Sequence, residues 1–242
     1  MTPSVHANPP HDALRDTLQG IDNAAQSADR PVPRLLAVSK TQPAAAVARL
    51  AAALRERQPD RIPAFGENYV QEAAAKQAEL ASGTDVAAIE WHLIGHLQSN
   101  KAREAATLFD WVQTVDRAKL VDALARHRPA GREPLNLLIQ VNIDDESGKH
   151  GCRPDAIAAL AAAIAGHANL RLRGLMAIPA PAPEPAVRRQ AFADMHRCFR
   201  ALREAHPRVD TLSMGMSDDY PLAIAEGATM VRIGTALFGR RS

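Results

Sequence analysis

Short apolar segments alternate with longer segments rich in Ala, Leu, Arg and Glu along almost the whole chain. The apolar segments have the length of buried β-strands, and the longer segments have the length of crossover helices. The expected strands are residues 34–40, 62–66, 89–95, 111–115, 135–143, 172–178, 211–214 and 230–233. The expected helices between them are residues 43–57, 68–81, 99–108, 117–126, 154–167, 186–205 and 219–227.

Strands that alternate with helices predict an α/β protein with a parallel sheet. Eight strands favour a closed (β/α)8 barrel, the TIM barrel, which takes about 250 residues as one domain. An open nucleotide-binding sheet would show a glycine-rich turn after its first strand, whereas this chain has Ser39-Lys40-Thr41-Gln42-Pro43 there. We therefore expect a single barrel domain over residues 12–242.

Three segments lie outside this repeating pattern. An extra helix is expected from Asp12 to about Arg30, because Leu14, Leu18 and Ile21 share one face. Residues 1–11 are expected to form a disordered tail. The run 179–185 contains four prolines, which exclude helix and regular strand, so a surface loop is expected there.

The amino-acid composition and the net charge argue against several classes of protein. The formal net charge of the 242 residues is +2, with 46% apolar and 23% charged residues, so neither a nucleic-acid partner nor a membrane partner is indicated. No stretch approaches the ~18 apolar residues of a membrane span, and the amino terminus has no apolar signal-peptide core. Cys152 and Cys198 form no CxxC pair, which favours a reduced, cytoplasmic protein. A monomer is expected, with a dimer as the alternative, because no exposed apolar face is evident.

Lys40 is the most unusual residue of the pattern. It ends an apolar strand in a chain that has only five lysines against twenty-four arginines. A partly desolvated ammonium loses its proton more easily, and the neutral amine is the form that attacks a carbonyl. The alternative is a strand-end lysine in a surface ion pair.

The segments 212–219 and 231–239 are typical of a phosphate site. In TIM barrels the loops after strands seven and eight often hold a phosphate against a helix N-terminus. Gly215 and Gly234 allow backbone N–H groups to approach phosphate oxygens, and Ser213, Ser217 and Thr235 add hydroxyl donors. The run 217–219 also has the composition of a helix N-cap with acidic first-turn residues. Ordinary turns are the alternative, but an amine beside a phosphate site predicts a Schiff base with pyridoxal 5′-phosphate (PLP).

Arg232 and two histidines are further candidates. A buried arginine needs a partner, and the pyridine nitrogen of PLP is a candidate acceptor. A salt bridge to a barrel carboxylate such as Glu67 is the alternative, and the two are not exclusive. Arginine at the pyridine nitrogen would weaken the ring as an electron sink, which makes transamination unexpected. His92 and His96 have metal-pair spacing only on a helix, and no third ligand is apparent, so no metal is expected.

The loop over residues 141–151 is expected to lie over the mouth of the site. It carries Lys149, which we consider as an accessory amine. Lys149 and Lys101 are also considered as secondary PLP sites.

Together these stretches resemble the PLP homeostasis proteins, a PLP-binding barrel family related to the N-terminal domain of alanine racemase. The resemblance rests on five motifs between residues 35 and 239: LLAVSKT, FGENYVQE, WHLIGHLQSNK, LSMGMSDD and VRIGTALFG.

The resemblance implies a fold-type III PLP barrel with Lys40 as the internal aldimine lysine. It implies Arg232 opposite the pyridine nitrogen, Asn68 and His92 near the ring, and phosphate contacts from Ser213, Gly234 and Thr235. It also implies a protein that binds PLP and influences vitamin B6 and amino-acid levels without established turnover. PLP-dependent apoenzymes are then possible recipients of the cofactor.

Two alternatives stay open. A PLP-dependent amino-acid racemase needs a second base opposite the lysine, which in alanine racemase is a tyrosine from a separate domain of the partner subunit. Tyr69 and Tyr220 are the only tyrosines in this chain. A Schiff-base aldolase acting on a sugar phosphate would more usually have its lysine on strand six, where residues 172–178 have none.

Overall fold

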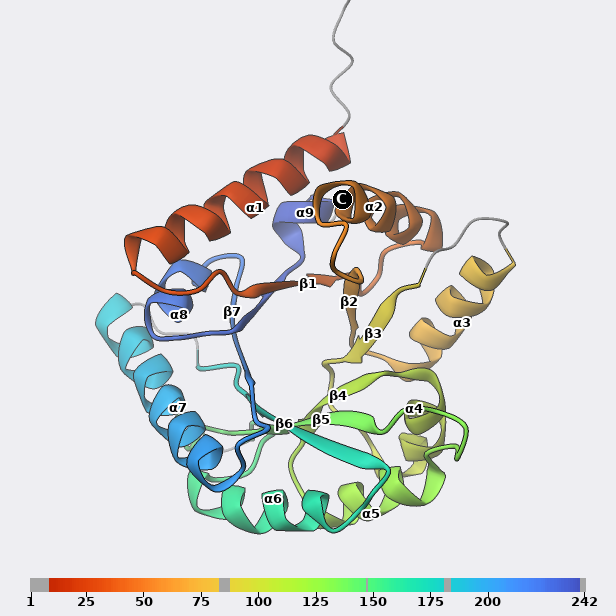
Figure 1. Cartoon of the computed structure of the whole chain (residues 1–242), viewed down its shortest axis with the longest axis vertical. Helices are drawn as coiled ribbons and strands as arrows, with labels where there is room; N and C mark the ends of the chain where they lie inside the picture. Colours follow the sequence, from red (N-terminus) through yellow and green to blue (C-terminus); the bar gives the residue numbers. More distant parts are fainter. Residues whose placement is uncertain (1–8, 83–87, 147, 181–183, 240–242) are drawn as a thin grey trace, which may run out of the picture.

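Eight parallel strands pair in sequence order, and β8 closes on β1, so the chain forms a complete barrel (Figure 1). The computed structural model describes residues 9–82, 88–146, 148–180 and 184–239. The strands are β1 (Arg34–Val38), β2 (Ala64–Glu67), β3 (Glu90–Leu93), β4 (Trp111–Val115), β5 (Leu135–Gln140), β6 (Leu170–Met176), β7 (Thr211–Met216) and β8 (Met230–Ile233). The predicted (β/α)8 barrel is confirmed.

Helices surround the strands on the outside of the barrel (Figure 1). The helices are α1 (Pro9–Ser27), α2 (Ala44–Arg57), α3 (Val70–Ala81), α4 (Ala102–Leu108), α5 (Ala118–His127), α6 (Ile157–Ala165), α7 (Pro185–Ala205), α8 (Tyr220–Ala225) and α9 (Thr235–Phe238). Short 3-10 turns, Ser99–Lys101 and Pro154–Ala156, precede α4 and α6. These turns take the first residues of two segments that the sequence predicted as continuous helices.

The main core lies between the strands and the helices. In α2 the buried residues Val47, Leu50, Ala51 and Leu54 recur at the spacing of one helix face, and the alanines allow close approach to the sheet. The extra helix α1 lies across α2, α8 and α9 on the outside (Figure 1). It buries Leu14, Ile21 and Ala25 against them, as the spacing predicted.

Several boundaries differ from the prediction. Helix α1 begins at Pro9 rather than Asp12, and the rest of the expected tail lies outside the described residues. Pro185 was assigned to the surface loop but is the first residue of α7, a position where the missing N–H of proline costs nothing. The short helix α9 was not expected at all. Asp219, not Ser217, occupies the N-cap position of α8 and makes no capping hydrogen bond there.

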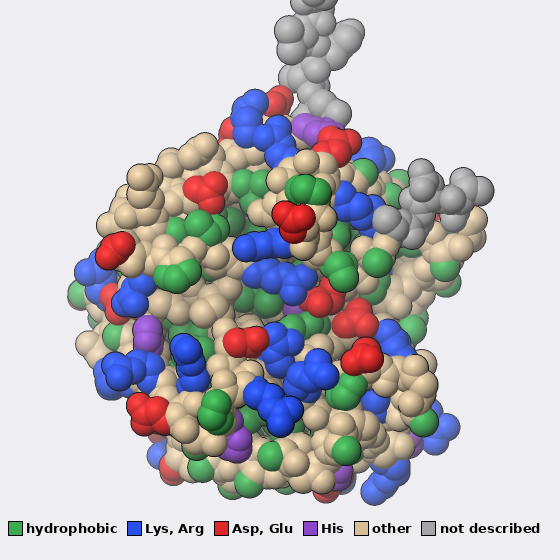
Figure 2. Space-filling model, in the orientation of Figure 1, with side chains coloured by type: hydrophobic (Ala, Val, Ile, Leu, Met, Phe, Trp, Pro, Cys, Tyr) green, Lys and Arg blue, Asp and Glu red, His purple; other side chains and the backbone are tan. Residues whose placement is uncertain are grey.

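The amino ends of the strands form a polar face. The strands run clockwise in Figure 1, so right-handed crossovers place these ends toward the viewer. Figure 2 shows basic and acidic side chains mixed over the centre of this face. Arg34 pairs with Glu90 at 2.7 Å and Arg173 with Asp210 at 2.6 Å, which closes this end of the barrel with neutralised charges.

No helix in the described part of the chain combines the length and apolar character that crossing a membrane requires.

Candidate functional site

Lys40 lies just past the carboxyl end of β1, the end at which barrel enzymes place their sites. The strand stops at Val38, and the chain turns over Thr41, whose φ of 63° is rare for a β-branched residue. Lys40 is half-buried and lines a cavity of about 70 Å³, which is room for a phosphate-sized group. The cavity lining is Val38, Lys40, Thr41, Gln42, Gly234, Thr235, Phe238 and Gly239.

Gly234 and Thr235 provide the opposite wall of this cavity, at the junction of β8 and α9. A Cβ atom on Gly234 would lie 3.2 Å from the carbonyl oxygen of Val38 and 3.3 Å from its Cβ, closer than ordinary packing. Glycine therefore lets the loop after β8 lie directly against β1. Lys40, Gly234 and Thr235 thus meet in one place, although 194 residues separate Lys40 from Gly234 in the sequence (234 − 40).

Polar groups of β2 and α3 hold the backbone on both sides of Lys40. The Lys76 ammonium donates to the carbonyl of Ser39 at 2.8 Å and to Glu67 Oε1 at 2.6 Å. The Ser39 hydroxyl also donates to Glu67 Oε1 at 2.6 Å. On the other side, the backbone N–H of Thr41 donates to Glu72 Oε1, which Lys76 contacts at 3.2 Å. Lys76, Glu67 and Glu72 thus form a clamp on residues 39–41, and this clamp stabilises the strained turn.

The clamp also corrects the predicted partner of Glu67. Glu67 is fully buried between β2 and α3 and pairs with Lys76, so the ion pair with Arg232 that was considered as an alternative is wrong. Burial raises the pKa of Glu67, although the hydrogen bonds from Lys76 and Ser39 act in the opposite direction.

Arg232 instead ends a chain of buried hydrogen bonds that crosses the barrel interior. It donates to the Ser213 hydroxyl at 2.9 Å and to the carbonyl of Ala177 at 2.8 Å. Ser213 donates to Gln113 Oε1 at 2.8 Å, and Gln113 Nε2 lies 2.9 Å from His92 Nδ1. His92 Nε2 lies 2.7 Å from Glu90 Oε1, the carboxylate that pairs with Arg34.

The donor and acceptor roles along this chain of hydrogen bonds determine the protonation state of His92. Ser213 accepts from Arg232 and so donates to Gln113, which leaves the Gln113 amide group to donate to His92 Nδ1. His92 is then neutral with its proton on Nε2, directed at Glu90. Burial lowers the pKa of His92, which favours the same neutral form.

Glu90 and Arg232, the two ends of this chain of hydrogen bonds, keep their charges. Burial would raise the pKa of Glu90, but the hydrogen bond from His92 and the Arg34 guanidinium hold it at about 2. Burial lowers the pKa of Arg232 to about 10, so this side chain stays a cation at neutral pH. Within the described part of the polypeptide, two of its five N–H groups have protein acceptors and the other three have none.

Replacing Gln113 with leucine tests how much this chain of hydrogen bonds contributes to the stability of the fold. Leucine has a similar size but would leave the Ser213 hydroxyl proton without its acceptor and His92 Nδ1 without its donor inside the barrel. We expect the free energy of unfolding to fall by about 1–3 kcal/mol, measured by urea denaturation. The exposed Gln71→Leu is the control, with an expected change within about 0.5 kcal/mol. Equal stability of Gln113→Leu and wild type would contradict this account.

The other predicted residues lie apart from the Lys40 cavity. Asn68 lines a neighbouring cavity of about 400 Å³ together with Tyr69, Gly95, His96 and Lys101. Its backbone lies so close to Gly95 that no larger residue would fit there. Ser217 is half-buried beyond β7, and its contact with a phosphate stays a prediction. A larger cavity of about 520 Å³, lined by Pro134 and Leu170, lies at the amino ends of the strands and is not the predicted site.

The accessory lysines and the two tyrosines lie outside the Lys40 cavity. Lys149 pairs with Glu146 at 2.8 Å, and Lys101 pairs with Glu104 at 3.0 Å. Gly20 of α1 lies against the Tyr220 hydroxyl, so Tyr220 is directed to the outside of the barrel. Tyr69 is exposed beside Asn68.

Sequence reasoning missed Gln113 and Lys76. Gln113 lies at the centre of the buried strand β4, where a long polar side chain among apolar neighbours was a usable signal. Lys76 lies in a helix with many polar residues, where nothing distinguished it from a solvated side chain.

Comparisons with known proteins support the same family that the sequence motifs resemble. The family described as alanine racemase, N-terminal domain, matches residues 11–242. The chain is 53% identical over 224 residues to the pyridoxal phosphate homeostasis protein of Pseudomonas aeruginosa, covering 91% of each chain. It is 50% identical over 207 residues to the protein of that name from Escherichia coli, covering 86% of this chain and 85% of that one. It is also similar to the solved structure of PipY from Synechococcus elongatus with PLP bound, with a TM-score of 0.77 and 38% identity over 95% of this chain and 100% of PipY.

Proposed function

This chain belongs to the pyridoxal phosphate homeostasis proteins, and from that premise we propose that it binds PLP through Lys40 and takes part in intracellular PLP and amino-acid homeostasis. The single observation that carries the proposal is the position of Lys40, held by the clamp beside the Gly234–Thr235 wall. When bound, PLP would supply an aldehyde that condenses with the Lys40 amine to a Schiff base, with loss of water.

The residues around Lys40 fit the remaining groups of PLP. Thr235 is exposed and offers a hydroxyl donor to the phosphate, and Gly234 beside it lines the same cavity. Ser217 and Asn68 are proposed as further contacts at the mouth. Arg232 would donate an N–H group to the pyridine nitrogen and keep that nitrogen unprotonated. The resemblance implies that Ser213 contacts the phosphate and that His92 lies near the ring. We propose instead that both act through Arg232, because both belong to the buried chain of hydrogen bonds that orients it.

We propose a binding role rather than catalytic turnover. A racemase needs a second base facing the lysine, and Tyr220 is directed to α1 instead. Tyr69 remains as an exposed candidate. In this role PLP-dependent apoenzymes would receive the cofactor in the cytoplasm, and the free cysteines Cys152 and Cys198 fit a reducing compartment.

The proposal is tested by trapping the cofactor on the wild-type protein. The full-length protein is incubated with PLP, reduced with borohydride, digested and mapped by mass spectrometry. We expect a visible absorbance band that reduction removes and a pyridoxyl group on Lys40, with far less on Lys101 and Lys149. A colourless protein that cannot be loaded would contradict PLP binding. The Schiff-base aldolase would then be the better-supported alternative. Interconversion of alanine enantiomers by the loaded protein would favour the racemase.

A further inference from the structure

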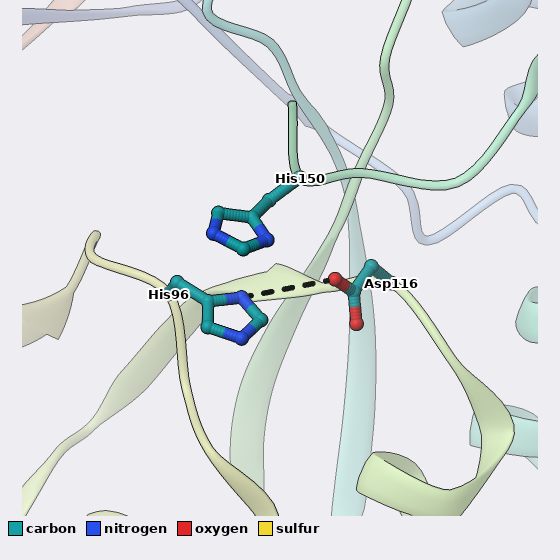
Figure 3. Close-up of side chains that lie close together, drawn as sticks. All are labelled: His96, Asp116 and His150. Atoms are coloured by element: carbon teal, nitrogen blue, oxygen red, sulfur yellow. Dashed lines mark ion pairs between the residues drawn. The ribbon is translucent and has the colours of Figure 1, made fainter. Parts of the chain in front are cut away.

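Two histidines and an aspartate meet at the carboxyl end of the barrel, outside the cavity that Lys40 lines. His96 follows β3, Asp116 follows β4, and His150 lies in the loop after β5. One ligand atom from each residue lies within 4.8 Å of the others. Figure 3 shows the two imidazole rings one above the other, both beside the Asp116 carboxylate. Three separate loops therefore bring these side chains to one point.

Hydrogen bonding within the protein does not account for this arrangement. The ion pair of the cluster, from His96 Nδ1 to Asp116 Oδ2, is 3.9 Å long, which is beyond hydrogen-bond range. The rings stack with their centroids 3.6 Å apart and an interplanar angle of 12°. Within the described residues, neither ring nitrogen of His96 or His150 has a hydrogen-bond partner. Free ring nitrogens and a carboxylate oxygen thus face a shared space.

This donor set matches a borderline transition-metal ion. Zn²⁺ binds imidazole nitrogen and carboxylate oxygen at about 2.0–2.2 Å, and three protein ligands leave its fourth position open. Mg²⁺ and Ca²⁺ prefer all-oxygen sites and gain little from two imidazoles. His96 and His150 are exposed, so small side-chain rotations would bring their nitrogens to bonding distance.

We propose that His96, Asp116 and His150 form a binding site for one Zn²⁺-like divalent transition-metal ion. Asp116 would bind through Oδ2, because its Oδ1 accepts from the Arg117 guanidinium at 2.5 Å. The Arg117 charge opposes a cation, but it also fixes the carboxylate, since Arg117 donates to the carbonyl of Leu97 at 3.0 Å. The positive charge of Arg117 therefore lowers the affinity, while the orientation that it imposes raises it.

A bound ion would tie the loop after β5 to the ends of β3 and β4. That loop is otherwise held by Asn142, whose side chain donates to the carbonyl of Glu146 at 3.0 Å, and by Gln140, which donates to the carbonyl of His150 at 3.2 Å. It also carries Lys149. The metal would thus fix the position of a loop at the mouth of the barrel.

Calorimetric titration of the untagged full-length protein with ZnCl₂ tests the site, in parallel on preparations without PLP and loaded with PLP. We expect one Zn²⁺ per chain and at least about tenfold weaker binding for His96→Ala and for His150→Ala. His167→Ala is the matched control, because His167 also faces a carboxylate, Asp122 at 3.4 Å, but belongs to no three-ligand group in the described chain. It should bind Zn²⁺ as wild type does.

Circular dichroism establishes that each variant is folded, which exposed substitutions should permit. Wild-type affinity in both His96→Ala and His150→Ala, or no stoichiometric Zn²⁺ binding by wild type, would overturn the proposal. Because the PLP-free protein is titrated directly, the result does not depend on whether Lys40 binds PLP.

Discussion

Replacing Lys40 with alanine should weaken PLP binding at least about 100-fold and remove the visible absorbance of the loaded protein. That loss corresponds to about 2.7 kcal/mol or more. The methyl group of alanine supplies no amine for the PLP aldehyde, so only contacts to the phosphate and the pyridine nitrogen would remain. The fold should be unaffected, because Lys40 lies beyond the end of β1 and is half-buried rather than part of the core. Equilibrium dialysis and absorbance titration measure both effects.

Lys149→Ala is the control for this result. Lys149 is also half-buried and, among the described residues, its ammonium pairs with Glu146 alone, so its removal should leave the absorbance and the affinity close to wild type. If Lys40→Ala kept the visible band with wild-type affinity, another amine would hold the cofactor and the proposed role of Lys40 would be wrong. If Lys149→Ala alone removed the band, the accessory amine would be the true site.

The barrel could be predicted from the sequence because its signals are local. Eight apolar segments of strand length each lie between helical segments, and no long-range information is needed to count them. The boundaries were less certain. Pro185 was assigned to a loop by its proline neighbours, but the first turn of a helix accepts proline equally well. The end of β1 was placed at Lys40 because the left-handed conformation of Thr41 has no signature in a β-branched residue.

The candidate site could be predicted only in part. That Lys40, Gly234 and Thr235 lie together could be predicted, because a lysine and a glycine stand out at the ends of apolar strands; their contact with PLP stays a prediction. The alternative pairing of Glu67 with Arg232 was wrong, since a carboxylate on β2 can face either the interior of the barrel or a helix. Its true partner, Lys76, lies nine residues further on in α3 and looks solvent-exposed in the sequence. Likewise, His96 meets His150 only because the loops after β3 and β5 converge.

Replacing Lys76 with methionine should lower the free energy of unfolding by about 3–5 kcal/mol at neutral pH. Methionine fills a similar space but leaves the Glu67 carboxylate buried without its cation. Lys76 and Glu67 are almost inaccessible, with side-chain exposures of 4% and 0%, so water cannot replace the lost partner. The carbonyl of Ser39 loses a donor as well, and we expect weaker PLP binding because the clamp beside Lys40 is broken.

The pH dependence distinguishes a lost ion pair from lost packing. Burial raises the pKa of Glu67 even beside Lys76, and without that ammonium the pKa rises further. A buried acid with a raised pKa binds its proton more tightly in the folded state than in the unfolded state. Stability is therefore retained below the unfolded pKa and lost as the pH rises toward the folded pKa. The stability difference between wild type and Lys76→Met should widen between about pH 5 and pH 8 in urea denaturation.

The double variant Glu67→Gln, Lys76→Met separates the contribution of the buried charge to stability from the contribution of side-chain packing. A neutral amide in place of the carboxylate removes the uncompensated charge, so the double variant should be more stable than Lys76→Met at neutral pH. The stability of the double variant should change less over the same pH range than that of Lys76→Met, because the group at position 67 no longer titrates. If both variants lost the same stability at every pH, Lys76 would act through packing alone. The carboxylate of Glu67 would then contribute nothing to holding the turn that presents Lys40.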